Sequence, residues 1–144
     1  MEDVLKFENR DSLYKFLIDE FGLTKTEERY DSKNFGNFFI TLSSRDFLLR
    51  YINDRSILNI EISSHSDPTK WYGLSFIRDY IYNPENINAD VGHLDNTSRV
   101  KELNDFLRKD FGLISDLFNR ENYEDTIAKI NLLLKKQFLQ KFNK

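Results

Sequence analysis

Three successive runs with a period of two, in which every second residue is apolar, constrain the fold more than any other feature of this sequence. The runs cover residues 37–42, 47–52 and 58–63. Side chains along a strand point alternately to its two faces, so each run predicts a strand with one buried face. The breaks between the runs, at 43–44 and 53–56, are short and polar. Short connections of this kind favour an antiparallel meander.

The two faces of this predicted sheet differ in character. Leu58, Ile60 and Ile62 share one face, which we expect to pack against helices. The other face carries a mixed set of side chains, namely Phe39, Arg50, Asn59 and Glu61. Such a face either contacts solvent or meets a partner.

Apolar residues at intervals of three and four predict helices around this sheet. The predicted helices cover residues 10–21, 69–82 and 123–142, and a further helix follows a cap at Thr97 or Ser98, with its apolar pattern over 100–118. Ser66-Asp67-Pro68 supplies a start signal for the second helix, and Asn83-Pro84 supplies a stop. Gly112 interrupts the pattern over 100–118 and predicts a kink or a split. Polar residues over 24–34 and 83–96 predict loops.

The order of these elements is one helix, three strands and three helices, which is typical of an α+β fold. We therefore predict a three-stranded antiparallel meander with the N-terminal helix and the three C-terminal helices packed on one face. No linker or repeat divides the sequence, and its length suits one domain. Residues 1–144 are expected to form that single α+β domain.

Charge and cysteine content exclude several classes of protein. The chain has no Cys, which excludes a disulfide framework, a thiolate zinc site and a Cys nucleophile. Its net charge is −3 and its pI about 5.4, whereas nucleic-acid binders usually carry a basic surplus. The N-terminus lacks the pattern of a signal peptide, and no stretch approaches about 18 apolar residues. We expect a soluble cytoplasmic protein with neither a nucleic acid nor a membrane as its partner.

No motif indicates catalysis or metal binding. Asp110-Phe111-Gly112 matches the metal-binding tripeptide of kinases, but it lies inside a helical pattern without the other kinase motifs. His65 and His93 each lie beside turn residues, and neither has a second His at helical spacing. We therefore expect a non-enzymatic protein with no cofactor and no metal. An enzyme with an unrecognised site stays open as an alternative.

Arginine and aromatic residues occur together on the predicted strands. Arg45, Arg50 and Arg55 lie on or beside them, with Phe39 and Tyr51 nearby. A sheet of this kind can stack single-stranded bases. The arginines alternate only loosely with the aromatics, and neighbouring carboxylates dilute their charge, which favours ordinary cross-strand pairing.

The most suggestive feature is the segment from Asp79 through Ser98, which contains neither Lys nor Arg. It holds four carboxylates and two tyrosines. Acidic groups would speed the encounter with a basic protein partner, and aromatic rings would anchor it. We predict that the partner-binding residues are Asp79, Tyr80, Tyr82, Glu85, Asp90 and Asp95. A solvated loop is the alternative.

Three further segments carry a resemblance to a known class. They are Arg45-Asp46-Phe47 through Ser64, Trp71-Tyr72-Gly73-Leu74-Ser75-Phe76, and Glu102-Leu103-Asn104-Asp105-Phe106-Leu107. A small acidic α+β chain with this layout resembles the immunity proteins of bacterial polymorphic toxin systems, over roughly residues 35–142. The resemblance is one of layout and implies a protein that neutralises a cognate toxin by covering its active site. The alternative is a small regulatory or structural module that forms a homodimer through an exposed edge strand.

Overall fold

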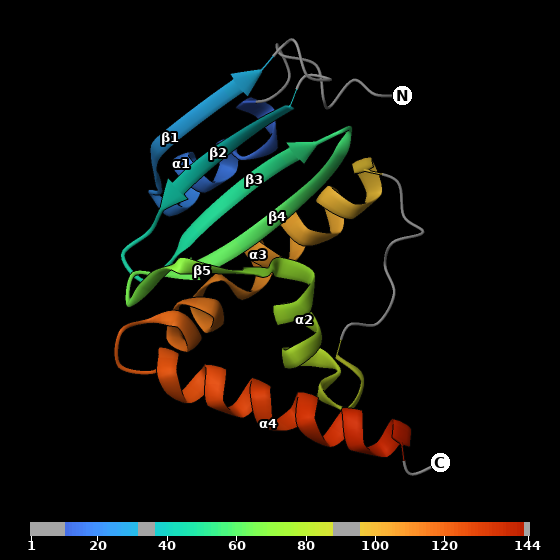
Figure 1. Ribbon diagram of the computed structural model, residues 1–144. Helices are drawn as coiled ribbons and strands as arrows, with labels where there is room; N and C mark the ends of the chain where they lie inside the picture. Colours follow the sequence, from blue (N-terminus) through green and yellow to red (C-terminus); the bar gives the residue numbers. More distant parts are fainter. Residues whose placement is uncertain (1–10, 32–36, 88–95, 143–144) are drawn as a thin grey trace.

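A five-stranded antiparallel sheet dominates the computed structural model, which describes residues 11–31, 37–87 and 96–142. The strands follow one another in chain order across the sheet (Figure 1). They are β1 (Thr24–Asp31), β2 (Asn37–Ser43), β3 (Leu48–Asp54), β4 (Ile57–Ser64) and β5 (Asp67–Gly73). The α+β class and the antiparallel meander are confirmed, and the three predicted strands are β2, β3 and β4. The predicted number of strands is wrong, because β1 and β5 extend the sheet on both sides.

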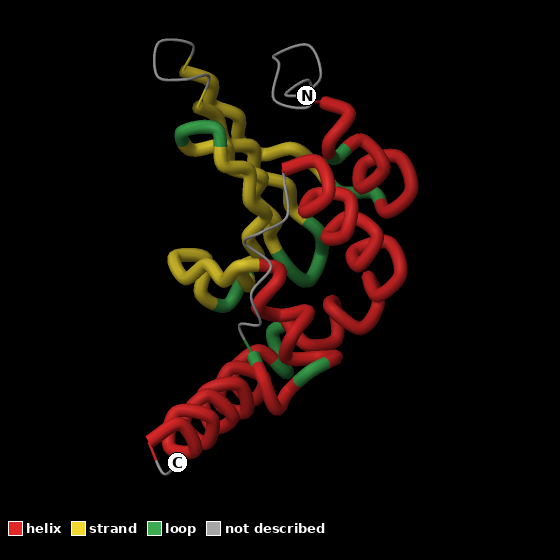
Figure 2. The backbone as a smooth tube through the Cα atoms, turned by 90° about the vertical axis from the view of Figure 1, so that its right-hand side faces the viewer, coloured by secondary structure: helices red, strands yellow, loops and turns green. Residues whose placement is uncertain are grey.

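The helices that the structure describes leave one face of this sheet uncovered. They are α1 (Lys15–Phe21), α2 (Leu74–Tyr82), α3 (Asn96–Phe118) and α4 (Tyr123–Phe142), with a 3-10 turn, η3, at Pro84–Asn86. The side view shows α1 and α3 on one side of the strands and no helix over the other side (Figure 2). In both views α2 and α4 lie beyond β5, below the sheet. The prediction that all four helices pack on one sheet face is therefore wrong for α4, which packs mainly against α3 and η3.

Strand β1 was predicted as part of a loop because its residues give no apolar alternation. All eight residues of Thr24–Asp31 are exposed, and five of them are charged. The pairing with β2 comes from the backbone, with Glu28 opposite Ile40 and Tyr30 opposite Phe38. A strand at the edge of a sheet needs no apolar face to complete its hydrogen bonds, so its sequence can remain polar.

Strand β5 replaces the first part of the predicted helix 69–82. Pro68 lies in this edge strand. An edge strand tolerates a residue without a backbone N–H, just as the first turn of a helix does. Tyr72 lies opposite Ile62 of β4 and shares the covered face. The helix begins only after Gly73, whose backbone is extended (φ −60°, ψ 136°). Trp71 and Tyr72 suit a strand as well as a helix, so the apolar spacing alone was ambiguous.

The core lies between the covered sheet face and α1 and α3. Leu58, Ile60 and Ile62 are at most 1% exposed, which confirms the predicted direction of β4. The hydroxyl of buried Tyr51 donates to Asn104 Oδ1 at 2.7 Å, and Asn104 Nδ2 donates to the Leu13 carbonyl at 2.9 Å. This chain of hydrogen bonds ties β3 to α3 and to the segment that precedes α1.

The C-terminal helices agree closely with prediction. Helix α4 has the predicted bounds. Helix α3 is kinked at Asp110 (φ −114°, ψ 22°), two residues before Gly112, where the pattern predicted an interruption. Among the described residues, no helix combines the length and the apolar character needed to cross a bilayer.

Candidate functional site

The uncovered sheet face carries a row in which cations and aromatic rings alternate across the strands. We call it the cation–aromatic row, formed by Arg29 on β1, Phe39 on β2, Arg50 on β3 and Trp71 on β5. The guanidinium carbons of Arg29 and Arg50 lie 5.9 and 6.0 Å from the centre of the Phe39 ring. The guanidinium carbon of Arg50 lies 4.1 Å from the centre of the Trp71 ring. Stacking of this kind fixes a long side chain in one position before any partner arrives.

Arg50 is the centre of this row. It lies opposite Thr41 on β2 and Glu61 on β4, and its Nη2 donates to Glu61 Oε1 at 2.9 Å. The side chains of Arg50 and Glu61 are 28% and 30% exposed, so the ion pair is partly shielded from water. Arg50 Nε is buried and has no hydrogen-bond partner among the described residues. Stacking and one carboxylate therefore hold this arginine, and much of its hydrogen-bonding capacity is not used within the sheet.

The electrostatics of the row suit a protein partner better than a phosphate backbone. Arg50 is paired with Glu61, and Arg29 Nε lies 3.6 Å from Glu27 Oε2. Both cations of the row thus have a carboxylate beside them, whereas nucleic-acid binding relies on uncompensated positive charge. Tyr51, which follows Arg50 in the sequence, is buried on the opposite face.

Both edges of the sheet carry features that hinder the addition of another strand. Strand β1 is exposed and charged, and its register with β2 shifts between Lys25 and Glu27. Strand β5 contains Pro68, and the register of β4 and β5 shifts between Ile62 and Ser64. Charges, bulges and proline are the usual means by which sheets avoid edge pairing. These features argue against a homodimer formed through an edge strand.

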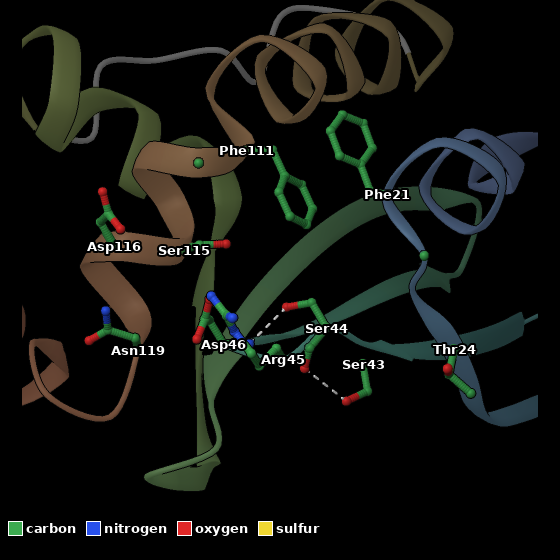
Figure 3. A pocket seen from close by; sticks show the side chains of 12 residues that line it. Phe21, Thr24, Ser43, Ser44, Arg45, Asp46, Phe111, Ser115, Asp116 and Asn119 are labelled. Carbon is green, nitrogen blue, oxygen red and sulfur yellow. Dashed lines mark hydrogen bonds and ion pairs between the residues drawn. The ribbon is translucent and has the colours of Figure 1, made fainter.

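A hollow of about 680 Å³ lies between the end of α1, the β2–β3 connection and the second half of α3 (Figure 3). The stacked rings of Phe21 and Phe111, with centres 4.4 Å apart, lie on one side of it. The opposite side is polar and includes Arg45, Asp46 and Asn119. The hollow combines one cation with two carboxylates, one amide and several hydroxyl groups, and this mixture indicates no particular ligand.

A serine and a histidine meet beside this hollow without the geometry of a nucleophile and its base. His65 Nε2 lies 2.8 Å from the Ser44 carbonyl and 3.4 Å from Ser43 Oγ. A contact of 2.8 Å to a carbonyl oxygen requires a proton on Nε2, so this nitrogen is a donor and cannot at the same time accept the Ser43 proton. In the described ranges, no group of three His, Asp or Glu residues could hold a metal ion.

Four of the residues predicted to bind a basic partner lie in the part of the chain that the structure describes, and they differ in exposure. Asp79 is only 8% exposed, so it offers little contact area. Tyr80 is half-buried, and Glu85 is exposed. Asp90 and Asp95 lie outside the described residues. The predicted cluster is therefore reduced, within the described residues, to Tyr82 and Glu85 as its accessible members.

Tyr82 itself contacts α3. Its ring is 54% exposed, its hydroxyl donates to Asp110 Oδ2 at 2.6 Å, and Lys109 Nζ lies 5.5 Å from the ring centre. The hydrogen bond to Asp110 raises the pKa of the Tyr82 hydroxyl. A partner here would meet a tyrosine that already has neighbours of both charges.

Sequence analysis missed two members of the row, Trp71 and Arg29, because their strands were missed. Residues 69–72 show no alternation of apolar and polar side chains, so the β-branched and aromatic residues Thr69, Trp71 and Tyr72 were the available signal for β5. No comparable signal marks Arg29.

Comparison of the chain with models of protein families, with curated proteins and with solved structures found no match in any of the three.

Proposed function

We propose that this chain is a non-enzymatic protein-binding module of the immunity type, which neutralises a partner toxin by covering it with the uncovered sheet face. The observation that carries the proposal is the position of Arg50, stacked 4.1 Å from Trp71 and paired with Glu61 on a face that no helix covers. Tryptophan and arginine are the residue types that most often dominate binding energy at protein interfaces.

The fold supports this use of the sheet. A face held by hydrogen bonds between five strands is rigid, and rigid surfaces lose less entropy on binding than loops do. Both sheet edges are charged or interrupted, so the broad face is the part of the sheet most open to a partner. A module that acts by occlusion needs such a broad, preorganised surface rather than a deep pocket.

The experiment is quantitative capture of partners from the source cells with the wild-type chain and with Trp71→Ala and Arg50→Ala variants. Lys70→Ala is the matched control, because Lys70 is the preceding residue of β5 and its side chain is 69% exposed. Removal of a dominant interface residue costs about 2 kcal/mol, which is about a 30-fold loss of affinity. We expect such a loss with Trp71→Ala and Arg50→Ala, and wild-type capture with Lys70→Ala.

Circular dichroism and thermal unfolding of each variant test whether the fold is retained. Equal capture of the partner by the wild type, Trp71→Ala and Arg50→Ala would refute binding through the row. In that case Tyr82→Ala and Glu85→Lys variants test the accessible residues of the predicted acidic segment. Inhibition of the purified partner's activity by stoichiometric wild-type protein then distinguishes neutralisation from binding alone.

A further inference from the structure

Helix α4 is apolar on two opposite sides. Its inner side packs against the rest of the protein through Ile127, Ile130 and Leu134, of which Ile130 is 1% exposed. Its outer side carries two large apolar side chains, Leu132 and Leu139, which are 55% and 48% exposed. A surface helix normally has one apolar stripe, and a helix that is apolar all round is normally buried. Leu132 and Leu139 therefore form a short second apolar stripe on α4, which runs between charged residues.

The inner contacts hold the helix in place, so the outer side is presented by a fixed element. Gln137 pairs with the backbone of Ile87 through two hydrogen bonds, at 2.8 and 2.9 Å. Thr126 Oγ1 donates to the Leu117 carbonyl at 2.7 Å. Contacts near both ends of α4 thus anchor it, and the outer stripe has a defined position along the helix.

Charge is distributed unevenly along α4. Glu124 and Asp125 lie in the first turn. No carboxylate follows between residues 126 and 142, where the four charged residues are all lysines, at positions 129, 135, 136 and 141. Lys129 pairs with Asp125 at 3.0 Å, and this carboxylate raises its pKa. Lys135 and Lys136 take part in none of the ion pairs between described residues.

This asymmetry makes α4 complementary to an antiparallel copy of itself. On an α-helix, residues three and four apart share a side, so Glu124, Ala128, Leu132 and Lys135 lie along the outer stripe. A register with Ala128 opposite Leu132 of the second copy puts the acidic first turn beside Lys135 and Lys136 of that copy. Antiparallel helix dipoles and the small side chain of Ala128 at the crossing favour the same arrangement.

We propose that the outer side of α4 binds a second copy of this chain through antiparallel pairing of the two α4 helices. The surface differs from the cation–aromatic row and from the sheet edges, and the pairing goes beyond the proposed function. Two partly exposed leucines make a small centre compared with a standard interface of about 800 Å² per partner. The pairing is therefore expected to depend on protein concentration and, through its charges, on salt.

The first test is sedimentation equilibrium of the full chain over a wide range of concentrations, for the wild type and for Leu132→Glu. We expect the wild type to dimerise reversibly and Leu132→Glu to weaken the dimer at least about tenfold. Ile57→Glu is the matched control, because Ile57 is 56% exposed but lies at the β3–β4 turn. It should dimerise as the wild type does. All three proteins should give the same circular dichroism spectrum.

A charge exchange tests the orientation of the helices. Glu124→Lys with Asp125→Lys makes α4 wholly basic, and Lys135→Glu with Lys136→Glu makes its second half acidic. Each double variant alone should dimerise more weakly than the wild type at low salt, and an equimolar mixture should recover the dimer. Recovery in the mixture cannot result from a folding defect.

Three results would overturn the proposal. The wild type could stay monomeric at the highest concentration, Leu132→Glu could dimerise as well as the wild type, or the mixed charge variants could fail to associate. A monomer that binds phosphatidylglycerol vesicles through Leu132 and its lysines would identify an anionic lipid surface as the occupant instead. A Trp71→Ala variant should dimerise normally, which separates this test from that of the proposed function.

Discussion

The hydrogen bonds of Tyr51, Asn104 and Leu13 give the sharpest prediction about stability. Tyr51 is 0% exposed, and Asn104 is half-buried. Removal of the hydroxyl by Tyr51→Phe leaves Asn104 Oδ1 without a donor at a position that water can approach. The expected loss of unfolding free energy is about 1 kcal/mol.

Removal of the Asn104 side chain should lower the unfolding free energy considerably more than removal of the Tyr51 hydroxyl does. Asn104→Ala leaves the buried Tyr51 hydroxyl without its acceptor and the Leu13 carbonyl without its donor. An unsatisfied buried polar group costs about 1–3 kcal/mol, so the two together should cost about 3 kcal/mol. In a chain of this size that corresponds to a fall of about 6–12 °C in Tm.

The double variant gives the decisive comparison. In the Asn104→Ala background, Tyr51→Phe removes a hydroxyl that has already lost its acceptor, so it should raise stability by about 1 kcal/mol instead of lowering it. Urea unfolding followed by circular dichroism measures all four corners of the cycle. Tyr82→Phe, whose hydroxyl is exposed, should change stability by less than about 0.5 kcal/mol. Additive losses from Tyr51→Phe and Asn104→Ala would refute the reasoning.

Two other predictions concern the hairpin turn and alkaline pH. Arg55 and Ser56 both have positive φ, of 54° and 68°, which Asn and Gly adopt more easily. The double variant Arg55→Asn with Ser56→Gly should therefore raise the unfolding free energy, measured in urea, by about 1 kcal/mol. An unchanged unfolding free energy would contradict backbone strain at this turn. Burial raises the pKa of the Tyr51 and Tyr123 hydroxyls above the usual 10.0. The folded protein keeps these phenols protonated, whereas the unfolded chain loses their protons above about pH 10. The free energy of unfolding is therefore unaffected by these groups below pH 10, and above it falls by about 1.4 kcal/mol per pH unit and per phenol. Thermal unfolding between pH 8 and pH 11.5 should show this loss, and Tyr51→Phe should make it shallower.

The sequence predicts the buried half of the sheet well because burial imposes a pattern. The period of two in β2, β3 and β4 exists because alternate side chains, such as Leu58 and Ile60, enter the core. The last helix was predicted to the residue because its start and end also carry charge signals, with Glu124 first and Lys141 last. Where packing and electrostatics agree, a local pattern is enough.

The edge strands could not be predicted in the same way because their pairing is made by the backbone. No residue of β1 enters the core, so nothing in its side chains distinguishes it from a polar loop. Pro68 before Trp71 fits the start of a helix and an edge strand equally well. The row that includes Arg29 and Trp71 depends on strands far apart in the sequence, and only the sheet register brings its members together.

The same edge strands explain why a partner should approach the broad face of the sheet. A charged, bulged β1 and a proline-containing β5 widen the sheet while they block the addition of further strands. The contribution of these two strands to the core is small, since β1 is exposed throughout and β5 adds the half-buried Tyr72 to the covered face. What each strand adds is one end of the cation–aromatic row, with Arg29 at one end and Trp71 at the other. A three-stranded sheet would have an adequate buried face, but it would leave Arg50 without Trp71. The two outer strands therefore contribute more to the uncovered surface than to the core, as expected of a sheet whose broad face is used for recognition.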